Sequence, residues 1–264
     1  RWKRVTGVQT CALPIFEWIA RYFENVGQYP VKSRVSPGEI KNALPELPPS
    51  GSESFDLFLK DFDEIIIPGI THWQSPDFFA YFPANSSPPS VLAEMLTSAL
   101  GAQCMLWETS PAAAELEERM MEWLRVMTGP PEEFEGVIQD SASSATLAAL
   151  ITARERTTGF RSNSEGLRDA GKLRIYVSTQ THSSVEKGAG VAGFGRDNLV
   201  RVSVGKDFSM DPEALEGAIE ADIAAGYIPC CTVATIGTTG TTAVDPLRPV
   251  GEMCRKHGIW LHVD

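Results

Sequence analysis

Polar side chains that could contact a ligand follow four predicted β-strands of this sequence. They lie at residues 140–143, 181–184 and 235–239 and at Asp264. In an open α/β sheet, ligands bind beyond the carboxyl ends of the strands. This rule selects the four places as candidates for a binding or catalytic site.

The stretch QDSASSATL could bind an anion. It combines a strand end, a turn of small hydroxyl residues and a helix start, where free backbone N–H groups and the helix dipole attract negative charge. Ser141 and Ser143 can donate hydroxyl groups, and Ala142 lets the backbone approach a ligand closely. The alternative is a plain serine N-cap, and the residues alone favour neither.

Two further stretches carry groups suited to catalysis or binding. TQTHSSVE places His182 after a strand and before a helix capped by Ser183 or Ser184. A lone histidine is more often structural, so both roles stay open. In ATIGTTGTT, Gly237 and Gly240 free the backbone beside threonine hydroxyls. The alternative there is an ordinary β-turn.

The stretch WLHVD ends on an acid that the sheet does not need. A carboxylate at a buried strand end costs free energy unless it meets a cation. Asp264 is therefore predicted to contact a cationic group. It could also cap a following helix, and the two roles are compatible.

Strands and helices alternate from Gly136 onward, which predicts βαβ units and a largely parallel sheet. Asp211 and Pro212 mark one helix start, and Gly258 marks one helix end. The predicted strands are 136–139, 174–178, 199–204, 227–236 and 259–263, and the predicted helices are 143–156, one from 184, 211–225 and 249–257. The last strand ends with the sequence and has no helix to cover it, so we expect an incomplete domain.

The part before Gly136 is predicted to be helical, with loops. Helices are expected at 16–26, 54–67, 91–100 and 112–126, with a Pro/Ser/Gly linker at 48–54 and an aromatic, Pro-rich loop at 71–89. Residues 1–15 show no periodicity, and VTGVQTCALPI resembles the translation of a sequencing adaptor. We expect residues 1–15 to be a non-native leader.

Composition excludes several classes of protein. The formal net charge is −11, which argues against nucleic-acid binding and anionic membrane surfaces but not against a small anion in a local pocket. No apolar run approaches the roughly 20 residues that span a bilayer. The five cysteines have no metal or disulfide spacing, and Cys230 and Cys231 are expected to be buried thiols. We expect no metal and a cytoplasmic, reducing location.

Together these stretches resemble the aromatic-L-amino-acid decarboxylase family, within the group II decarboxylases that depend on pyridoxal 5′-phosphate (PLP). The matching stretches are PGITHWQSPDFFAYFPANSS, LWETSPAAAELE, GVIQDSASSATLAAL, STQTHSSVEKGA, ATIGTTGTTAVDP and IWLHVD. The resemblance implies an α/β fold: part of a type I PLP-dependent transferase large domain at 111–264, after a helical N-terminal dimerisation segment at 16–110.

The resemblance also assigns roles to residues of the cofactor site. Asp264 would pair with the ring nitrogen of PLP, and His182 would stack on the ring and take part in proton transfer. The phosphate would be held by Ala142 and Ser143, with Ser141 beside them. Thr239 would lie near the ring.

Residues of the aromatic loop would contact the substrate, an aromatic amino acid. Trp73 and Tyr81 would be walls of the pocket. Ala84 stands where the family usually has a threonine that touches the substrate carboxylate, so Asn85 or Ser86 could supply that contact instead. Met105 and Leu106 would face the site of the neighbouring subunit in a homodimer.

The family's Schiff-base lysine normally lies a few tens of residues beyond the aspartate, and this sequence stops first. Lys187 and Lys256 match no part of the lysine motif. We therefore expect this chain alone to be inactive. The alternatives are a glutamate or sulfinoalanine decarboxylase, an aldehyde synthase, or a non-catalytic chain that acts by binding only.

Overall fold

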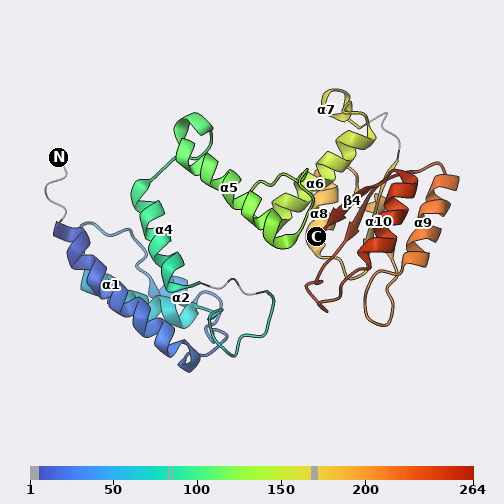
Figure 1. Cartoon of the computed structure of the whole chain (residues 1–264). Coiled ribbons are helices and arrows are strands. Elements are labelled where there is room, and N and C mark those ends of the chain that lie inside the picture. The colour runs from blue at the N-terminus through green and yellow to red at the C-terminus, as the bar shows by residue number, and fades with distance from the viewer. Residues whose placement is uncertain (1–5, 83, 85, 168–171) are drawn as a thin grey trace. The chain divides into compact units, whose positions relative to one another are not determined.

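The computed structural model describes residues 6–82, 84, 86–167 and 172–264. The chain divides into two compact units, Arg1–Gly101 and Ala102–Asp264. The described part of the first unit is helical, and the second contains a β-sheet with helices on both faces (Figure 1).

The described residues of the second unit form four parallel strands, one fewer than the five predicted. They are β1 (Leu173–Ser178), β2 (Leu199–Val202), β3 (Ile228–Ala234) and β4 (Trp260–Val263), and their order in the sheet is β2-β1-β3-β4. The chain runs from β1 outward to β2 and then returns to the other side of β1 for β3 and β4. The winding direction therefore reverses between β1 and β3. Such a reversal is where open α/β sheets bind ligands at their carboxyl edge.

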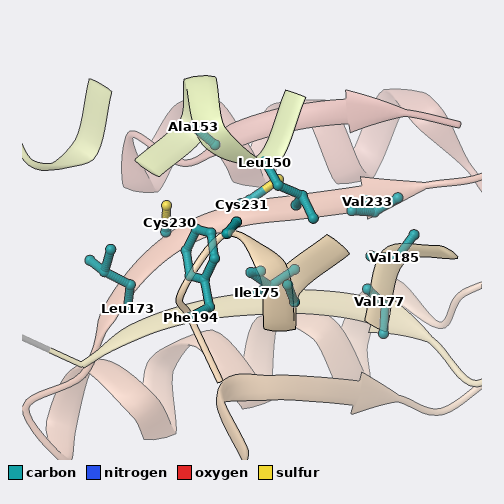
Figure 2. Packing of buried hydrophobic residues seen from close by; sticks show 12 residues of the cluster. Leu150, Ala153, Leu173, Ile175, Val177, Val185, Phe194, Cys230, Cys231 and Val233 are labelled. Atoms are coloured by element: carbon teal, nitrogen blue, oxygen red, sulfur yellow. The ribbon is translucent and has the colours of Figure 1, made fainter. Parts of the chain in front are cut away.

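Helices bury both faces of this sheet, which explains why β1 and β3 are apolar along most of their length. One face, called here the α6/α8 face, packs against α6 (Ala142–Thr157) and α8 (Ser183–Val191). Its core includes Leu150, Ala153, Ile175, Val177, Val185, Cys231 and Val233 (Figure 2). The opposite face packs against α9 (Pro212–Ala224) and α10 (Leu247–His257), with Tyr176, Val202, Leu215, Ile219, Ala234 and Val250 in its core.

The predicted helix boundaries in this unit are largely confirmed. The Asp211 carboxylate caps α9 by accepting the N–H groups of Glu213 and Ala214, with Pro212 as the first helical residue. Gly258 ends α10 with φ +69°. The remaining helical elements are α5 (Pro111–Thr128), α7 (Ser162–Glu165), η4 (Trp107–Thr109) and η5 (Arg196–Asn198).

The strand predicted at residues 136–139 is wrong. This segment joins no ladder in the described chain, and Val137 and Ile138 are exposed. The Ile138 N–H donates instead to the Glu117 carboxylate of α5, at 2.8 Å. A short apolar run becomes a strand only when another strand lies beside it, and the four strands of this sheet pair elsewhere.

The first unit consists of α1 (Thr6–Asn25), α2 (Glu39–Ala43), α3 (Phe55–Asp61) and α4 (Pro88–Leu100), with short turns η1 (Val26–Gln28), η2 (Phe62–Ile66) and η3 (Ile67–Gly69). Helix α1 begins at Thr6, ten residues before its predicted start, although Pro14 lies inside it. A helix that has formed at residues 16–25 can extend backwards at low cost, because nucleation is the costly step. The short α2 was not predicted.

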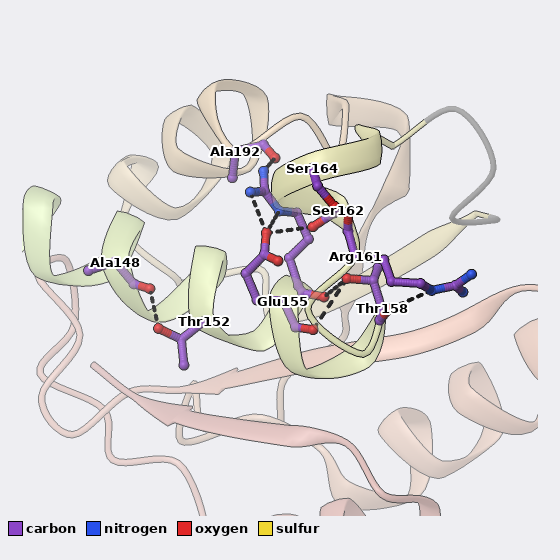
Figure 3. A network of polar contacts seen from close by, with 9 residues as sticks. Ala148, Thr152, Glu155, Thr158, Arg161, Ser162, Ser164 and Ala192 are labelled. Carbon is purple, nitrogen blue, oxygen red and sulfur yellow. Dashed lines mark hydrogen bonds and ion pairs between the residues drawn. The ribbon is translucent and has the colours of Figure 1, made fainter.

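A polar network fixes the C-terminal half of α6. Glu155 accepts hydrogen bonds from Arg154 and Ser162, and Arg154 also donates to the Ala192 carbonyl beyond α8 (Figure 3). The Ser162 hydroxyl and then the Arg154 guanidinium hold the pKa of Glu155 below its usual value. The network joins α6 to α7 and to the end of α8. It therefore helps to fix the direction of the α6 axis.

The expected burial of Cys230 and Cys231 is confirmed, since neither side chain is exposed. Burial disfavours the thiolate, and it raises the pKa of Cys230 to about 11 and that of Cys231 well above its usual value.

Because the thiolate is the reactive form, we expect iodoacetamide at about pH 8 to modify the exposed Cys104 but neither buried thiol. Peptide mapping checks this, with the denatured chain as the control. Equal labelling of Cys230 and Cys104 in the folded chain would contradict the structure.

Candidate functional site

Asp264 continues the ladder of β4. Its N–H donates to the Ala234 carbonyl at 2.8 Å, and its own carbonyl accepts the Ile236 N–H at 2.9 Å. Side chains alternate along a strand, and Trp260 packs on the α6/α8 face while Leu261 packs on the other. The Asp264 side chain therefore belongs to the α6/α8 face, at the carboxyl edge of the sheet.

The N-terminus of α6 lies on the same face and is open to solvent. Ser141 is the N-cap, and its hydroxyl accepts the Ser144 N–H at 3.2 Å. The N–H groups of Ala142 and Ser143 have no backbone acceptor within the described chain, as expected for the first turn of a helix. All three residues are exposed. The serine cap and the anion-binding geometry thus coexist, and the free N–H groups fit a phosphate.

His182 is the N-cap of α8, which corrects the prediction of Ser183 or Ser184. Its Nδ1 accepts the Ser184 N–H at 3.3 Å and lies 2.9 Å from the Ser184 hydroxyl oxygen. An imidazole nitrogen can accept an N–H as a serine oxygen does, and this contact sets the ring orientation. When Nδ1 accepts, the neutral ring carries its proton on Nε2. The ring is exposed beyond the carboxyl end of β1, beside the reversal of the winding.

The threonine-rich loop after β3 is a tight turn that leaves Thr239 exposed at its tip. Gly237 has φ +87°, and the N–H groups of Gly237 and Thr238 both donate to the Ala243 carbonyl. The Thr238 hydroxyl is buried against Thr241 at 2.7 Å, which leaves it no free position for a ligand. Thr239 and Thr242 are the exposed threonines of this turn, so the hydroxyl of Thr239 is open to a ligand.

Thr235 is a further candidate for the site, which the sequence did not single out among its neighbours. It is 5% exposed, and its hydroxyl oxygen has no hydrogen-bond partner among the described residues. By alternation with Cys231 and Val233, its side chain lies on the α6/α8 face, as that of Asp264 does. A buried hydroxyl without a partner is costly, so this one fits a site that a polar ligand completes.

The aromatic loop of the first unit has a stacked core. The Trp73 ring lies between Phe78, at 4.8 Å, and Tyr81, at 5.6 Å between ring centroids. Tyr81 adopts a left-handed backbone with φ +58°, and Gln74 donates to the Ala84 carbonyl at 3.0 Å. The structure therefore stacks Trp73 on Tyr81, and Ala84 is exposed. Asn85 lies outside the described residues.

His72 has a structural role next to this loop. It is 2% exposed, stacks on Tyr29 with 4.7 Å between ring centroids, and hydrogen bonds through Nδ1 to the Tyr22 hydroxyl at 2.9 Å. The backbone N–H of His72 donates to the Val31 carbonyl. The aromatic residues that surround His72 in the sequence indicate that it is buried. The residues that His72 contacts, Tyr22 and Tyr29, come from a distant segment of the chain.

Helix N-termini at the carboxyl edge of a parallel sheet are typical of the class of α/β domains that bind phosphorylated ligands, and the carboxylate of Asp264 at the same edge could pair with a cationic group of such a ligand. Within the described chain, no group of three or more His, Cys, Asp or Glu side chains could hold a metal ion. No helix in the same part is long and apolar enough to cross a membrane.

The comparisons with known proteins give the family. The model of the pyridoxal-dependent decarboxylase conserved domain matches residues 37–264. Tryptophan decarboxylase from Camptotheca acuminata is 43% identical over 94% of this chain and 51% of that protein, and phenylacetaldehyde synthase from Arabidopsis thaliana is 41% identical over 94% and 51%. The structure of Oryza sativa TDC with PLP and tryptamine has a TM-score of 0.93 at 33% identity, covering 100% of this chain and 56% of that one.

The chain belongs to the pyridoxal-dependent decarboxylase family. The family and the type of fold that the sequence motifs imply are thereby confirmed, and the cofactor of the family is PLP. The chain spans about half the length of the curated relatives it matches.

We expect the stability of the folded chain to fall below about pH 6.5 through His72, because burial lowers the pKa of its ring. The unfolded histidine binds a proton at a higher pH than the buried one. The contribution of His72 is therefore complete above the unfolded pKa and is lost as the pH falls through that value. Urea unfolding of wild type and His72→Gln across this range should show a smaller decline in the variant. A ring pKa at or above 6.5, measured by NMR, would contradict this.

Proposed function

We propose that these residues serve PLP-dependent decarboxylation of an aromatic L-amino acid to its amine and CO2, in a protein of the relatives' length. The observation that carries the proposal is the placement of Asp264 on the α6/α8 face, where the exposed N-termini of α6 and α8 also lie. A ring cation and a phosphate are the two charges that this set of groups would hold.

When bound, PLP supplies an electron-accepting ring that stabilises the charge left at Cα as CO2 departs. The carboxylate of Asp264 would accept a hydrogen bond from the ring nitrogen and raise the pKa of that nitrogen, because a negative charge favours the protonated form. This would keep a proton on the ring, and the role of Asp264 would be catalytic because its carboxylate would touch the cofactor.

The remaining cofactor contacts follow from the helix starts. The N–H groups of Ala142 and Ser143, with the Ser141 hydroxyl beside them, would bind the phosphate. His182 would stack on the ring and hold or move a proton at Nε2, since Nδ1 is occupied by Ser184. Thr239 would lie near the ring from the tip of its turn.

The aromatic substrate would meet the stacked rings of Trp73 and Tyr81. Both rings are exposed, at 41% and 72%, and an aromatic side chain gains from stacking on such surfaces. The substrate carboxylate would be bound beside Ala84, by Asn85 or Ser86, because Ala84 itself has no hydroxyl. The tryptamine in the Oryza sativa structure is an aromatic amine, which supports this class of product.

An aldehyde synthase is the second candidate function. It is favoured by the 41% identity to phenylacetaldehyde synthase, which is close to the 43% identity to tryptophan decarboxylase. The two functions share the cofactor site described here and differ in product, so the product decides between them.

We also propose a homodimer in which residues 16–110 serve dimerisation together with neighbouring exposed apolar surface, and a cytoplasmic, reducing location. No residue of α4 or α5 is buried, and both carry large exposed apolar side chains, including Leu92, Leu96, Leu100, Trp123 and Met127. Met105 and Leu106 are likewise exposed, as residues facing a neighbouring subunit would be in the isolated chain. Such patches mark association surfaces. The free thiols of Cys230, Cys231 and Cys254 support the location.

In a protein of the relatives' length that contains this chain, we expect CO2 and the amine from L-tryptophan, L-tyrosine or L-phenylalanine. Asp264→Ala should lower kcat/KM at least about a hundredfold, as the loss of a preorganised electrostatic contact does. Asp197→Ala, at an exposed aspartate, is the control. Turnover of L-glutamate alone, or unchanged activity of Asp264→Ala, would contradict the proposal. Aldehyde as the product would establish the second candidate, and the absence of turnover would favour a chain that acts by binding only.

A further inference from the structure

Asp245 is a buried carboxylate that the cofactor contacts proposed above do not include. It is 1% exposed, and both of its oxygens accept backbone N–H groups: Met210 at 2.7 Å and Thr235 at 2.8 Å. Its own N–H donates to the Thr235 carbonyl at 2.9 Å. A buried charge is tolerated only when it is well hydrogen bonded, and Asp245 uses its bonds to hold backbone.

Thr235 lies between the two aspartates. Its N–H and carbonyl both face Asp245, whereas the neighbouring Ala234 carbonyl and Ile236 N–H both face the backbone of Asp264. Successive backbone groups of an extended chain point to opposite sides, so one residue in this conformation can join both partners. The position of the Asp264 backbone therefore depends on the position of Thr235.

The loop between Thr235 and Asp245 brings these two residues together at its base. It is closed by an isolated antiparallel bridge between Ile236 and Val244, and it contains Thr242 with φ +57°. A β-branched residue in the left-handed region is strained and persists only when its surroundings enforce it. The carboxylate of Asp245 supplies charge-assisted hydrogen bonds at the base of this loop, which are stronger than bonds between neutral groups.

We propose that Asp245 is a positioning residue for Asp264: its carboxylate fixes the backbone of Thr235, and Thr235 in turn sets where the Asp264 carboxylate meets the cofactor ring nitrogen. The last step rests on the proposed function. The first step is a property of this chain alone.

Amide hydrogen exchange, followed by NMR on the 264-residue chain, tests the first step. In Asp245→Asn the Asp264 and Ile236 amides should exchange about tenfold faster or more, the effect of losing a charged hydrogen bond, while the Ile175 amide of β1 stays unchanged. Asp211→Asn is the matched control, since Asp211 also accepts two backbone N–H groups but contacts neither Thr235 nor Asp264. Unchanged exchange at Asp264 in Asp245→Asn would overturn the proposal.

A second measurement needs no variant, so it tests the proposal even if Asp245→Asn fails to fold. In the wild-type chain, the exchange of the Thr235, Ile236 and Asp264 amides should share one dependence on added denaturant, as one cooperative opening requires. If the Asp264 amide opens independently of the Thr235 amide, the proposal is overturned.

A cofactor analogue tests the second step. Deoxypyridoxine phosphate has no aldehyde to react with lysines, and a ¹⁵N label reports the protonation of its ring nitrogen by NMR. Wild type should raise the ring pKa, Asp264→Asn should abolish the rise, and Asp245→Asn should reduce it, with Asp211→Asn unchanged. A full rise in Asp245→Asn would overturn the second step. If wild type binds the analogue without raising its ring pKa, the proposed function fails at Asp264, while the exchange data still decide the role of Asp245.

Discussion

The pairing of β1 with β3 is the contact on which the rest of the site depends. Because these two parallel strands lie side by side while the chain winds away from them in opposite directions, the segments after them emerge at one edge of the sheet. The side chains that cover both faces of these strands are apolar. They exclude water from the backbone hydrogen bonds between the strands. His182 and Thr235 owe their positions to this arrangement.

The electrostatic potential at the helix starts is positive, whereas the net charge of the whole chain is negative. A formal net charge of −11 repels anions at long range, yet the N-termini of α6 and α8 present N–H groups and positive dipole ends at the carboxyl edge. Screening by salt limits the long-range repulsion to distances of about 10 Å, whereas the contacts at a helix start act at hydrogen-bond distance. An acidic protein can therefore hold a phosphate at this place.

Much of the fold follows from local patterns, and the failures have physical causes. The capping residue Asp211 and the terminating Gly258 mark real helix ends, because capping is decided by neighbouring atoms. Residues 136–139 look like a strand but have none beside them, since strand formation needs a distant partner. His182 caps α8 in place of the expected serine, because an imidazole nitrogen can accept the same N–H. The residue preferences for helix N-caps favour serine and do not predict a histidine there.

The alternation of strands and helices, the family motifs and the candidates Asp264, His182 and Ser141–Ser143 can be read from the sequence, because they depend on neighbours within a few residues. Three features become visible in the folded chain alone: Thr235 lies between Asp245 and Asp264, Thr238 is buried while Thr239 is exposed, and His72 supports its loop from within a cluster of distant aromatic rings. The contacts of the residues beside Thr235 with Asp264 and of His72 with Tyr29 join residues far apart in the chain, and the burial of Thr238 depends on how its turn folds against the sheet. Such contacts form only after the sheet has set the register of its strands.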